Sequence, residues 1–234
     1  MAPIRIYTDW NKRPSDNEDK IEPFRKYVFI CEGANTEVWY FQRLIDLRKQ
    51  LGIHPMIDIR LWEKTAPDRN ISYPRHLIEF AESMKSNDAL SFDRGHDKMI
   101  IVFDADIFGA KVKNYSDVIA LGEGYGDILG VTNPNFELYL LLHYEDSYDT
   151  EIVPHAEELL RNEKIGGKRF SYLLLQQRTG INSKTNSAIG DLAEHVRIAI
   201  DQEKHLNQDI HNCLGQLTSN IGKIIEMILS DTAQ

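Results

Sequence analysis

One segment of this sequence constrains the fold more than any other: an unbroken apolar run, Tyr27 to Cys31, followed directly by Glu32-Gly33. Unbroken runs of this length are typical of strands buried on both faces, as in parallel sheets. The next residues, Thr36 to Leu51, place apolar side chains at helical spacing and predict a helix with Thr36 as its N-cap. Open α/β sheets bind ligands at the carboxyl ends of their strands, so Glu32 falls where a functional site is expected.

A second strand of the same kind ends in two aspartates. Met99 to Phe103 is again continuously apolar, and Asp104-Ala105-Asp106 follows it. Residues i and i+2 of an extended backbone point to the same side, so Asp104 and Asp106 are expected to converge on one cation. Carboxylates with open coordination positions suit Mg²⁺ or Mn²⁺. Each aspartate taken alone has a commoner role as a helix cap or loop anchor, but clustering with Glu32 favours a cation, because grouped carboxylates repel one another.

The remaining pattern predicts an α/β protein. Strands are expected over Pro55–Trp62 and Asp127–Val131, helices over Pro74–Met84 and Asn114–Leu121, and a further helix begun by Asn133-Pro134 as cap and first residue. After Asp149 the pattern indicates helices only. They are expected over Glu151–Asn162, Phe170–Arg178, Asn186–Gln202 and Leu217–Leu229.

Alternating strands and helices predict a mostly parallel sheet flanked by helices, with a C-terminal helical extension. We divide the chain into a polar arm over residues 1–24, a catalytic core over 25–146, and a helical part over 147–234 that packs on the core. Residues 65–72 are expected to form a polar loop.

Two glutamates near helix starts are candidate supporting acids. Glu37 falls in the first turn of its helix, where a favourable interaction with the helix dipole and a role at the metal site are equally good explanations. Glu137 lies in an almost wholly apolar helix, which favours a carboxylate turned toward the site over one that serves the dipole alone. In the same region, Asn133 is interpreted as a cap and His143 as structural.

The charge pattern points in two directions. A net charge of −9 argues against non-specific nucleic-acid binding, which depends on Lys and Arg neutralising phosphates. The segment from Arg161 to Lys184, however, contains six basic residues and only one acidic residue. This segment supplies candidate phosphate contacts. The alternative is that these residues are ordinary solvated charges on the surface. The candidates are Lys168, Arg169, Arg178 and Lys184.

Several classes are disfavoured by what the sequence lacks. It has no apolar run long enough for a membrane span and no signal-peptide core at its start. Cys31 and Cys213 are expected to be free thiols in a reducing cytoplasm. The glycine patterns of dinucleotide-binding, P-loop and nucleophile-elbow motifs do not occur.

Three segments, taken in order, resemble the RloB family. They are Val28–Glu37, Ile101–Asp106 and Thr132–Tyr144, the last carrying Asn-Pro-Asn-Phe-Glu-Leu, the most specific of the motifs. The resemblance covers about residues 26–146. It is weaker at Gln216–Ile221, which is similar to a degraded form of the family's C-terminal Asn-Pro-Ser-Thr segment.

The resemblance implies a Toprim-like fold, found in topoisomerases, primases and OLD-type nucleases, whose acidic residues hold Mg²⁺ for phosphodiester chemistry. Carried over, Glu32, Asp104 and Asp106 would be the metal and catalytic carboxylates, with Glu37 and Glu137 as supporting acids. The catalytic lysine of some OLD-type sites has no clear counterpart here, and Lys184 is the best candidate.

The resemblance also implies a role in antiviral defence. RloB-type proteins occur with ATPases of the ABC/AAA type, so an ATPase partner is expected to sense or restrain while this chain cuts RNA, transfer RNA or DNA. A homo-oligomer is compatible with this expectation. Two alternatives remain open: a non-catalytic or regulatory Toprim subunit, and a metal-dependent phosphatase.

Overall fold

The computed structural model describes residues 23–62, 73–108 and 114–233. The arm expected over residues 1–24 lies outside these ranges except for its last two residues, and the loop expected over 65–72 lies wholly outside them.

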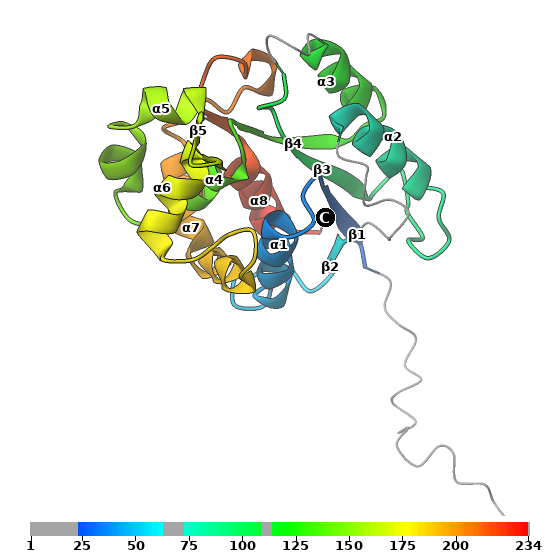
Figure 1. Cartoon of the computed structure of the whole chain (residues 1–234). Helices are drawn as coiled ribbons and strands as arrows, with labels where there is room; N and C mark the ends of the chain where they lie inside the picture. Colours follow the sequence, from blue (N-terminus) through cyan, green and yellow to red (C-terminus); the bar gives the residue numbers. More distant parts are fainter. Residues whose placement is uncertain (1–22, 63–72, 109–113, 234) are drawn as a thin grey trace, which may run out of the picture.

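A five-stranded sheet forms the centre of the molecule, with helices on both faces (Figure 1). The first four strands in the spatial order β2-β1-β3-β4-β7 pair in parallel, and β7 joins β4 antiparallel. The prediction of an α/β fold with a mostly parallel sheet is therefore confirmed. The strands are β1 (Arg25–Cys31), β2 (Ile57–Leu61), β3 (Lys98–Asp104), β4 (Ile128–Asn133) and β7 (Thr218–Ser219).

Side-chain alternation along β1 divides the core into two halves. Val28 and Ile30 face one side of the sheet, where they are buried with α2 (Pro74–Met84) and α3 (Tyr115–Gly124). Phe29 and its alternate neighbours face the other side, which is the larger half of the core. The helices there include α1 (Thr36–Asp46), α4 (Phe136–Leu141), α7 (Val196–Glu203) and α8 (Ile221–Ser230). Both faces of the sheet are covered, which explains why its strands read as unbroken apolar runs.

After Asp149 the sequence pattern had indicated helices only, but the structure also contains short strands in this part of the chain. A two-stranded hairpin, β5 (Lys164–Ile165) and β6 (Lys168–Arg169), precedes α6, and β7 enters the main sheet. The other elements are a π-helix (Tyr148–Ile152), α5 (Ala156–Arg161), α6 (Phe170–Thr179) and two 3₁₀ segments (Ser187–His195 and Ile210–Asn212).

Two predicted helix starts are wrong. Asn133 ends β4, is joined to Pro134 by a cis peptide bond, and donates its amide to the carbonyls of Cys213 and Gln216, so α4 begins only at Phe136. Thr36 is the first residue of α1 rather than its cap, because its hydroxyl donates to the carbonyl oxygen of Ser183. Helix α1 also ends at Asp46, short of the predicted Leu51, where turns follow.

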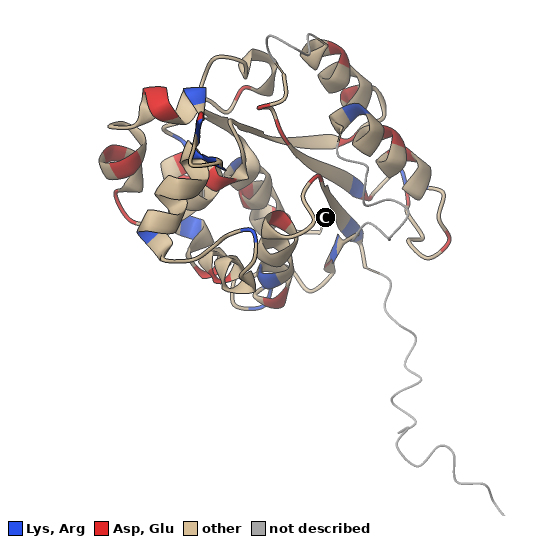
Figure 2. Ribbon diagram, viewed as in Figure 1, with Lys and Arg blue, Asp and Glu red and all other residues tan. Residues whose placement is uncertain are grey.

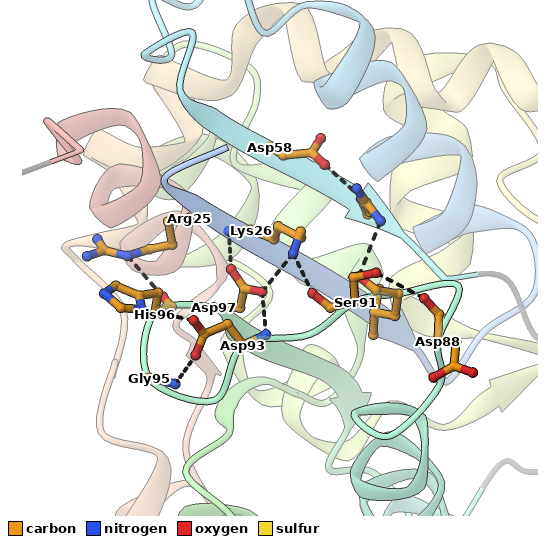
Figure 3. A network of polar contacts seen from close by, with 11 residues as sticks. Arg25, Lys26, Asp58, Asp88, Ser91, Asp93, Gly95, His96 and Asp97 are labelled. Atoms are coloured by element: carbon orange, nitrogen blue, oxygen red, sulfur yellow. Dashed lines mark hydrogen bonds and ion pairs between the residues drawn. The ribbon is translucent and has the colours of Figure 1, made fainter. Parts of the chain in front are cut away.

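A polar network closes the amino-terminal edge of the sheet (Figure 3). The Asp97 carboxylate accepts from the backbone nitrogens of Lys26 and Asp93, at 2.7 and 2.8 Å, and from the Lys26 ammonium. A cavity of about 920 Å³ lies at this edge. Its lining holds three basic and three acidic side chains, among which Arg60 pairs with Asp58 at 2.7 Å and Lys26 with Asp97 at 3.1 Å. Because opposite charges are matched here, we read this edge as structural.

Three smaller expectations can be compared with the structure. Cys31 and Cys213 are buried and are not joined in a disulfide, as expected. His143 is structural in the sense expected of it, because its ring lies in the core and bonds to the hydroxyl of Tyr40. Within the part of the chain that the structure describes, no helix has the length and apolar character needed to cross a membrane.

Candidate functional site

Asp104, the last residue of β3, lies at the centre of an acidic cluster. Its Oδ1 accepts a hydrogen bond of 2.7 Å from the hydroxyl of Thr132, its partner in the register of β3 and β4. Its backbone nitrogen donates to Oε2 of Glu32 at 3.1 Å. Glu32 follows the neighbouring strand β1, and its own nitrogen donates to the Val102 carbonyl. Adjacent parallel strands therefore bring the two carboxylates together, as the sequence predicted.

Glu37 and Glu137 complete the cluster from the first turns of α1 and α4. The Glu37 carboxylate occupies the space beside Gly33, where a Cβ atom would overlap it. Glu137 has no exposed surface at all. Burial, and then the charges of Glu37, Glu32 and Glu137, raise the pKa of Asp104 well above its usual range. The negative charges of three glutamates thus act on Asp104, and like charges brought together in this way repel one another.

Lys184 supplies a cation within the cluster. Its Nζ lies 2.6 Å from Oε1 of Glu137, although about half of the lysine side chain is exposed. Burial opposes its charge, but Glu137 and Glu37 outweigh this and raise the pKa of Lys184 above its ordinary value. The turn that carries it is tied to the start of α1, because Asn35 donates its side-chain amide to the Lys184 carbonyl at 2.9 Å. Lys184 is therefore a protonated and well-positioned group.

The two carboxylate oxygens of Glu137 differ in their contacts. Its Oε1 is bonded by Ser183 and Lys184, whereas its Oε2 is buried and finds no partner among the described residues. Buried carboxylate oxygens are seldom left unpaired unless a water or an ion reaches them. Beside this region a cleft of about 330 Å³ opens. Its lining includes Glu32, Gly33, Asn35, Thr36, Glu37, Asp104 and Lys184.

The donor set of the cluster fits a hard divalent cation. Carboxylate and hydroxyl oxygens are ligands that Mg²⁺ and Mn²⁺ prefer, and Mg²⁺ often uses only one or two carboxylates and keeps several waters. Within residues 23–62, 73–108 and 114–233, no three His, Cys, Asp or Glu side chains already surround one point closely enough to hold an ion. A cation there would be held by few protein ligands, as Mg²⁺ often is.

Asp106 sits beside the cluster and has a different partner. Because β3 ends at Asp104, Asp106 belongs to the turn that follows, and the alternation of an extended strand does not reach it. Its Oδ2 lies 3.4 Å from a guanidinium nitrogen of Arg169. Burial and the charge of Glu137 raise the pKa of Asp106, while Arg169 and Lys184 oppose this.

The four predicted phosphate contacts are not grouped together. Lys184 and Arg169 reach the acids, and Lys168 lies on the same hairpin as Arg169, where Figure 2 shows basic colouring. The Lys168 ammonium lies 5.1 Å from the centre of the Tyr172 ring. Arg178 is in the last turn of α6, where its guanidinium pairs with Glu151 at 3.5 Å. At a rise of 1.5 Å per residue it is about 13 Å from Arg169 along the helix.

Sequence reasoning missed several residues that hold the site in place. Thr132 orients Asp104, while Asn35 and Ser183 fix the turn that carries Lys184; no local pattern marks these three, because their contacts join distant parts of the chain. The hairpin was detectable, since Gly166-Gly167 is a recognised two-residue turn signal.

Comparison with known proteins gives one positive result. No curated protein and no solved structure matches the chain. The family model described as "RloB-like protein" matches residues 27–228, which include every strand of the sheet except the start of β1 and all the acidic residues described above. The chain therefore belongs to the RloB-like protein family.

Proposed function

We propose that this protein is a metal-dependent nuclease that hydrolyses phosphodiester bonds in RNA, including transfer RNA, or in DNA. One observation carries the proposal: Asp104 ends a central strand with Glu32, Glu37 and Glu137 gathered around it, and an oxygen of the buried Glu137 has no hydrogen-bond partner among the described residues. Like charges brought together inside a protein are unfavourable unless a cation offsets them. A site built this way suits a divalent cation and a phosphate.

Glu32, Asp104 and Asp106 are the residues we assign to hold Mg²⁺ or Mn²⁺. When bound, such an ion would stabilise charge developing on the phosphate and help to ionise a water. Thr132 keeps the Asp104 carboxylate in one orientation through its 2.7 Å hydrogen bond. Glu32 lies at the open cleft and is placed to take or return a proton.

Lys184 is assigned to charge stabilisation. Its ammonium neutralises Glu137, which is the supporting acid deepest in the site, and both Lys184 and Glu37 line the cleft. A fixed cation at such a position stabilises negative charge on a phosphate without moving during the reaction. The sequence resemblance had made Lys184 the best candidate for a catalytic lysine.

We further propose that the protein acts in the cytoplasm as the effector of an antiviral defence system with an ABC/AAA-type ATPase. Membership of the RloB-like family supports this proposal, as do the segments by which the sequence resembles that family, Val28–Glu37 and Thr132–Tyr144. The ATPase would restrain or release the nuclease, and the Toprim-like description of the fold belongs to the same proposal.

The test is cleavage of a mixed panel: plasmid DNA, total cellular RNA and purified transfer RNA, each with Mg²⁺, Mn²⁺ or EDTA. We expect metal-dependent cutting of at least one polymer, and loss of cutting in EDTA. The panel is repeated with the proposed ATPase partner and ATP, so that an effector silent on its own is detected. No cutting in any arm, with metal and ATPase present, would overturn the proposal.

A regulatory subunit is the second candidate, and two observations favour it. The net charge of −9 opposes nucleic-acid binding by the isolated chain, and Lys184 already neutralises one acid of the cluster. Under this alternative the ATPase complex would cut, and Asp104→Ala would leave that cutting unchanged. Hydrolysis of a small phosphate ester without polymer cleavage would instead identify a phosphatase.

A further inference from the structure

The β5–β6 hairpin is an exposed tip beside the acidic cluster. Lys164 pairs with Arg169 and Ile165 with Lys168, so Gly166 and Gly167 form a two-residue turn. Both glycines have positive φ, 58° and 84°, as the tight turns of such hairpins require. Every side chain of the hairpin is exposed, including 57% of Ile165, an apolar residue at its end.

The hairpin carries three basic residues and no acidic one. Lys164 and Lys168 form no ion pair with any acidic residue in the described ranges. Arg169 is the exception, because its guanidinium reaches Asp106 at 3.4 Å. A second guanidinium nitrogen donates to the Asn162 carbonyl at 3.0 Å, which anchors the side chain at the edge of the site.

The Arg169–Asp106 contact has the character of an exchangeable pair. It is long, and 43% of the Arg169 side chain and 22% of the Asp106 side chain remain exposed. Ion pairs of this kind contribute little to stability. A guanidinium binds a phosphate through two parallel hydrogen bonds, and a phosphate group would therefore be a stronger partner than the distant carboxylate.

We propose that the β5–β6 hairpin grips the phosphodiester backbone of the nucleic-acid substrate, and that Arg169 passes from Asp106 to a substrate phosphate when a divalent cation binds the cluster. The inference rests on the proposed nuclease function. It predicts linkage: a cation that takes over the charge of Asp106 releases Arg169, so metal and nucleic acid strengthen each other's binding.

Arg178 is set aside by its position and Lys184 by its partner. Arg178 lies at the other end of α6, away from Asp106. The Lys184 ammonium is engaged by the buried Glu137 at 2.6 Å. The hairpin, by contrast, offers side chains that point outward next to an acidic residue of the site. A backbone held there would pass directly beside Asp106.

The experiment measures binding of a labelled RNA oligonucleotide, and of DNA with the same sequence, by fluorescence anisotropy. Ca²⁺ replaces Mg²⁺ so that binding is followed without relying on turnover, and gels verify that the oligonucleotide stays intact. The variants are Arg169→Ala and the double variant Lys164→Ala/Lys168→Ala. Arg75→Ala is the matched control, since Arg75 is an exposed basic residue on α2, on the other face of the sheet.

We expect each hairpin variant to weaken binding about tenfold or more and to reduce the salt dependence of the affinity by about one counterion per charge removed. Arg75→Ala should bind as wild type does. Ca²⁺ should tighten binding by wild type but much less by Arg169→Ala. Asp106→Asn should bind in EDTA more tightly than wild type does, because its Arg169 is already released.

Two results would overturn the inference. The first is that both hairpin variants bind with the affinity and salt dependence of wild type. The second is that wild type binds neither RNA nor DNA. If wild type cuts nucleic acid while the hairpin variants bind normally, the nuclease proposal stands and the hairpin inference fails. If the hairpin variants lose binding and no cutting occurs under any condition, the hairpin inference stands and the nuclease proposal fails.

Discussion

The ammonium of Lys184 lies 2.6 Å from Oε1 of Glu137, a carboxylate with no exposed surface. A turn distant in sequence thus inserts a cation among acids held by two helices and two strands. Burying a charge is costly, and removing only one member of such a pair leaves the other uncompensated. The pair therefore links the stability of the protein to the chemistry of its site.

The first prediction concerns this pair. Lys184→Met, measured by urea unfolding in EDTA, should lower the free energy of unfolding by about 2 kcal/mol, less than for a fully buried pair because half of the lysine is exposed. The double variant Lys184→Met/Glu137→Gln should lose less than the sum of the two single changes. Additive losses would show that the two side chains act independently.

The second prediction concerns the repulsion within the cluster. Asp104→Asn keeps the oxygen that accepts from Thr132 but removes one negative charge, so in EDTA at pH 7.5 it should raise the melting temperature by a few degrees, about 1 kcal/mol. Mg²⁺ should stabilise wild type and have little effect on the variant. Asp58→Asn, at the opposite edge of the sheet, is the control and should respond to Mg²⁺ as wild type does. A melting temperature lower than that of wild type in EDTA would contradict mutual repulsion.

The third prediction is a pH dependence that comes from His143. Its Nε2 lies 2.9 Å from the Tyr40 hydroxyl, and burial lowers the pKa of His143 from 6.5 to about 3. Between pH 6.5 and about 3, His143 therefore binds a proton in the unfolded chain but stays neutral in the folded chain. Stability from this group is fully present above pH 6.5 and is lost as the pH falls toward 3, by at most about 1.4 kcal/mol per pH unit.

The variant His143→Gln isolates this contribution. The difference in unfolding free energy between wild type and His143→Gln should shrink as the pH is lowered from 7 to 4, because only wild type loses the histidine contribution. Urea titrations at several pH values measure it. A difference that stays constant over that range would show that His143 is protonated in the folded state or is not buried.

The fourth prediction compares two glycines. At Gly33 a Cβ would overlap the Glu37 carboxylate, which is a movable side-chain end, whereas at Gly190 it would lie 2.5 Å from the backbone oxygen of Trp39. Gly33→Ala should therefore displace Glu37 and weaken Mn²⁺ binding several-fold, with little loss of stability. Gly190→Ala should destabilise the protein by about 1–3 kcal/mol and leave Mn²⁺ affinity nearly unchanged. Calorimetry and urea unfolding separate these effects, and equal loss of stability in both variants would refute the distinction.

The central strands and their acids could be predicted from sequence because their signal is local. β1 and β3 are buried on both faces, so their residues form unbroken apolar runs, and Glu32 and Asp104 follow those runs directly. Glu137 was also identifiable, because a carboxylate in an otherwise apolar helix requires a partner.

What the sequence pattern missed depends on contacts between distant segments. β7 has only two residues, Thr218 and Ser219, and no periodicity marks it. It exists because β4 offers an open edge, where the Asn220 side chain also bonds to the backbone of Val131 and Leu129. The predicted cap role of Asn133 fails for a similar reason, since carbonyls of the Cys213–Gln216 turn are its partners.

The most direct test of the central claim is the rate of nucleic-acid cleavage by wild type, Asp104→Ala and Asp58→Ala. It is measured with Mn²⁺ and with EDTA, in the presence of the proposed ATPase partner. We predict that wild type and Asp58→Ala cut at similar metal-dependent rates, and that Asp104→Ala, shown to be folded by circular dichroism, cuts at least about a hundredfold more slowly. Equal cutting by folded Asp104→Ala would contradict the assignment of this cluster as the catalytic site.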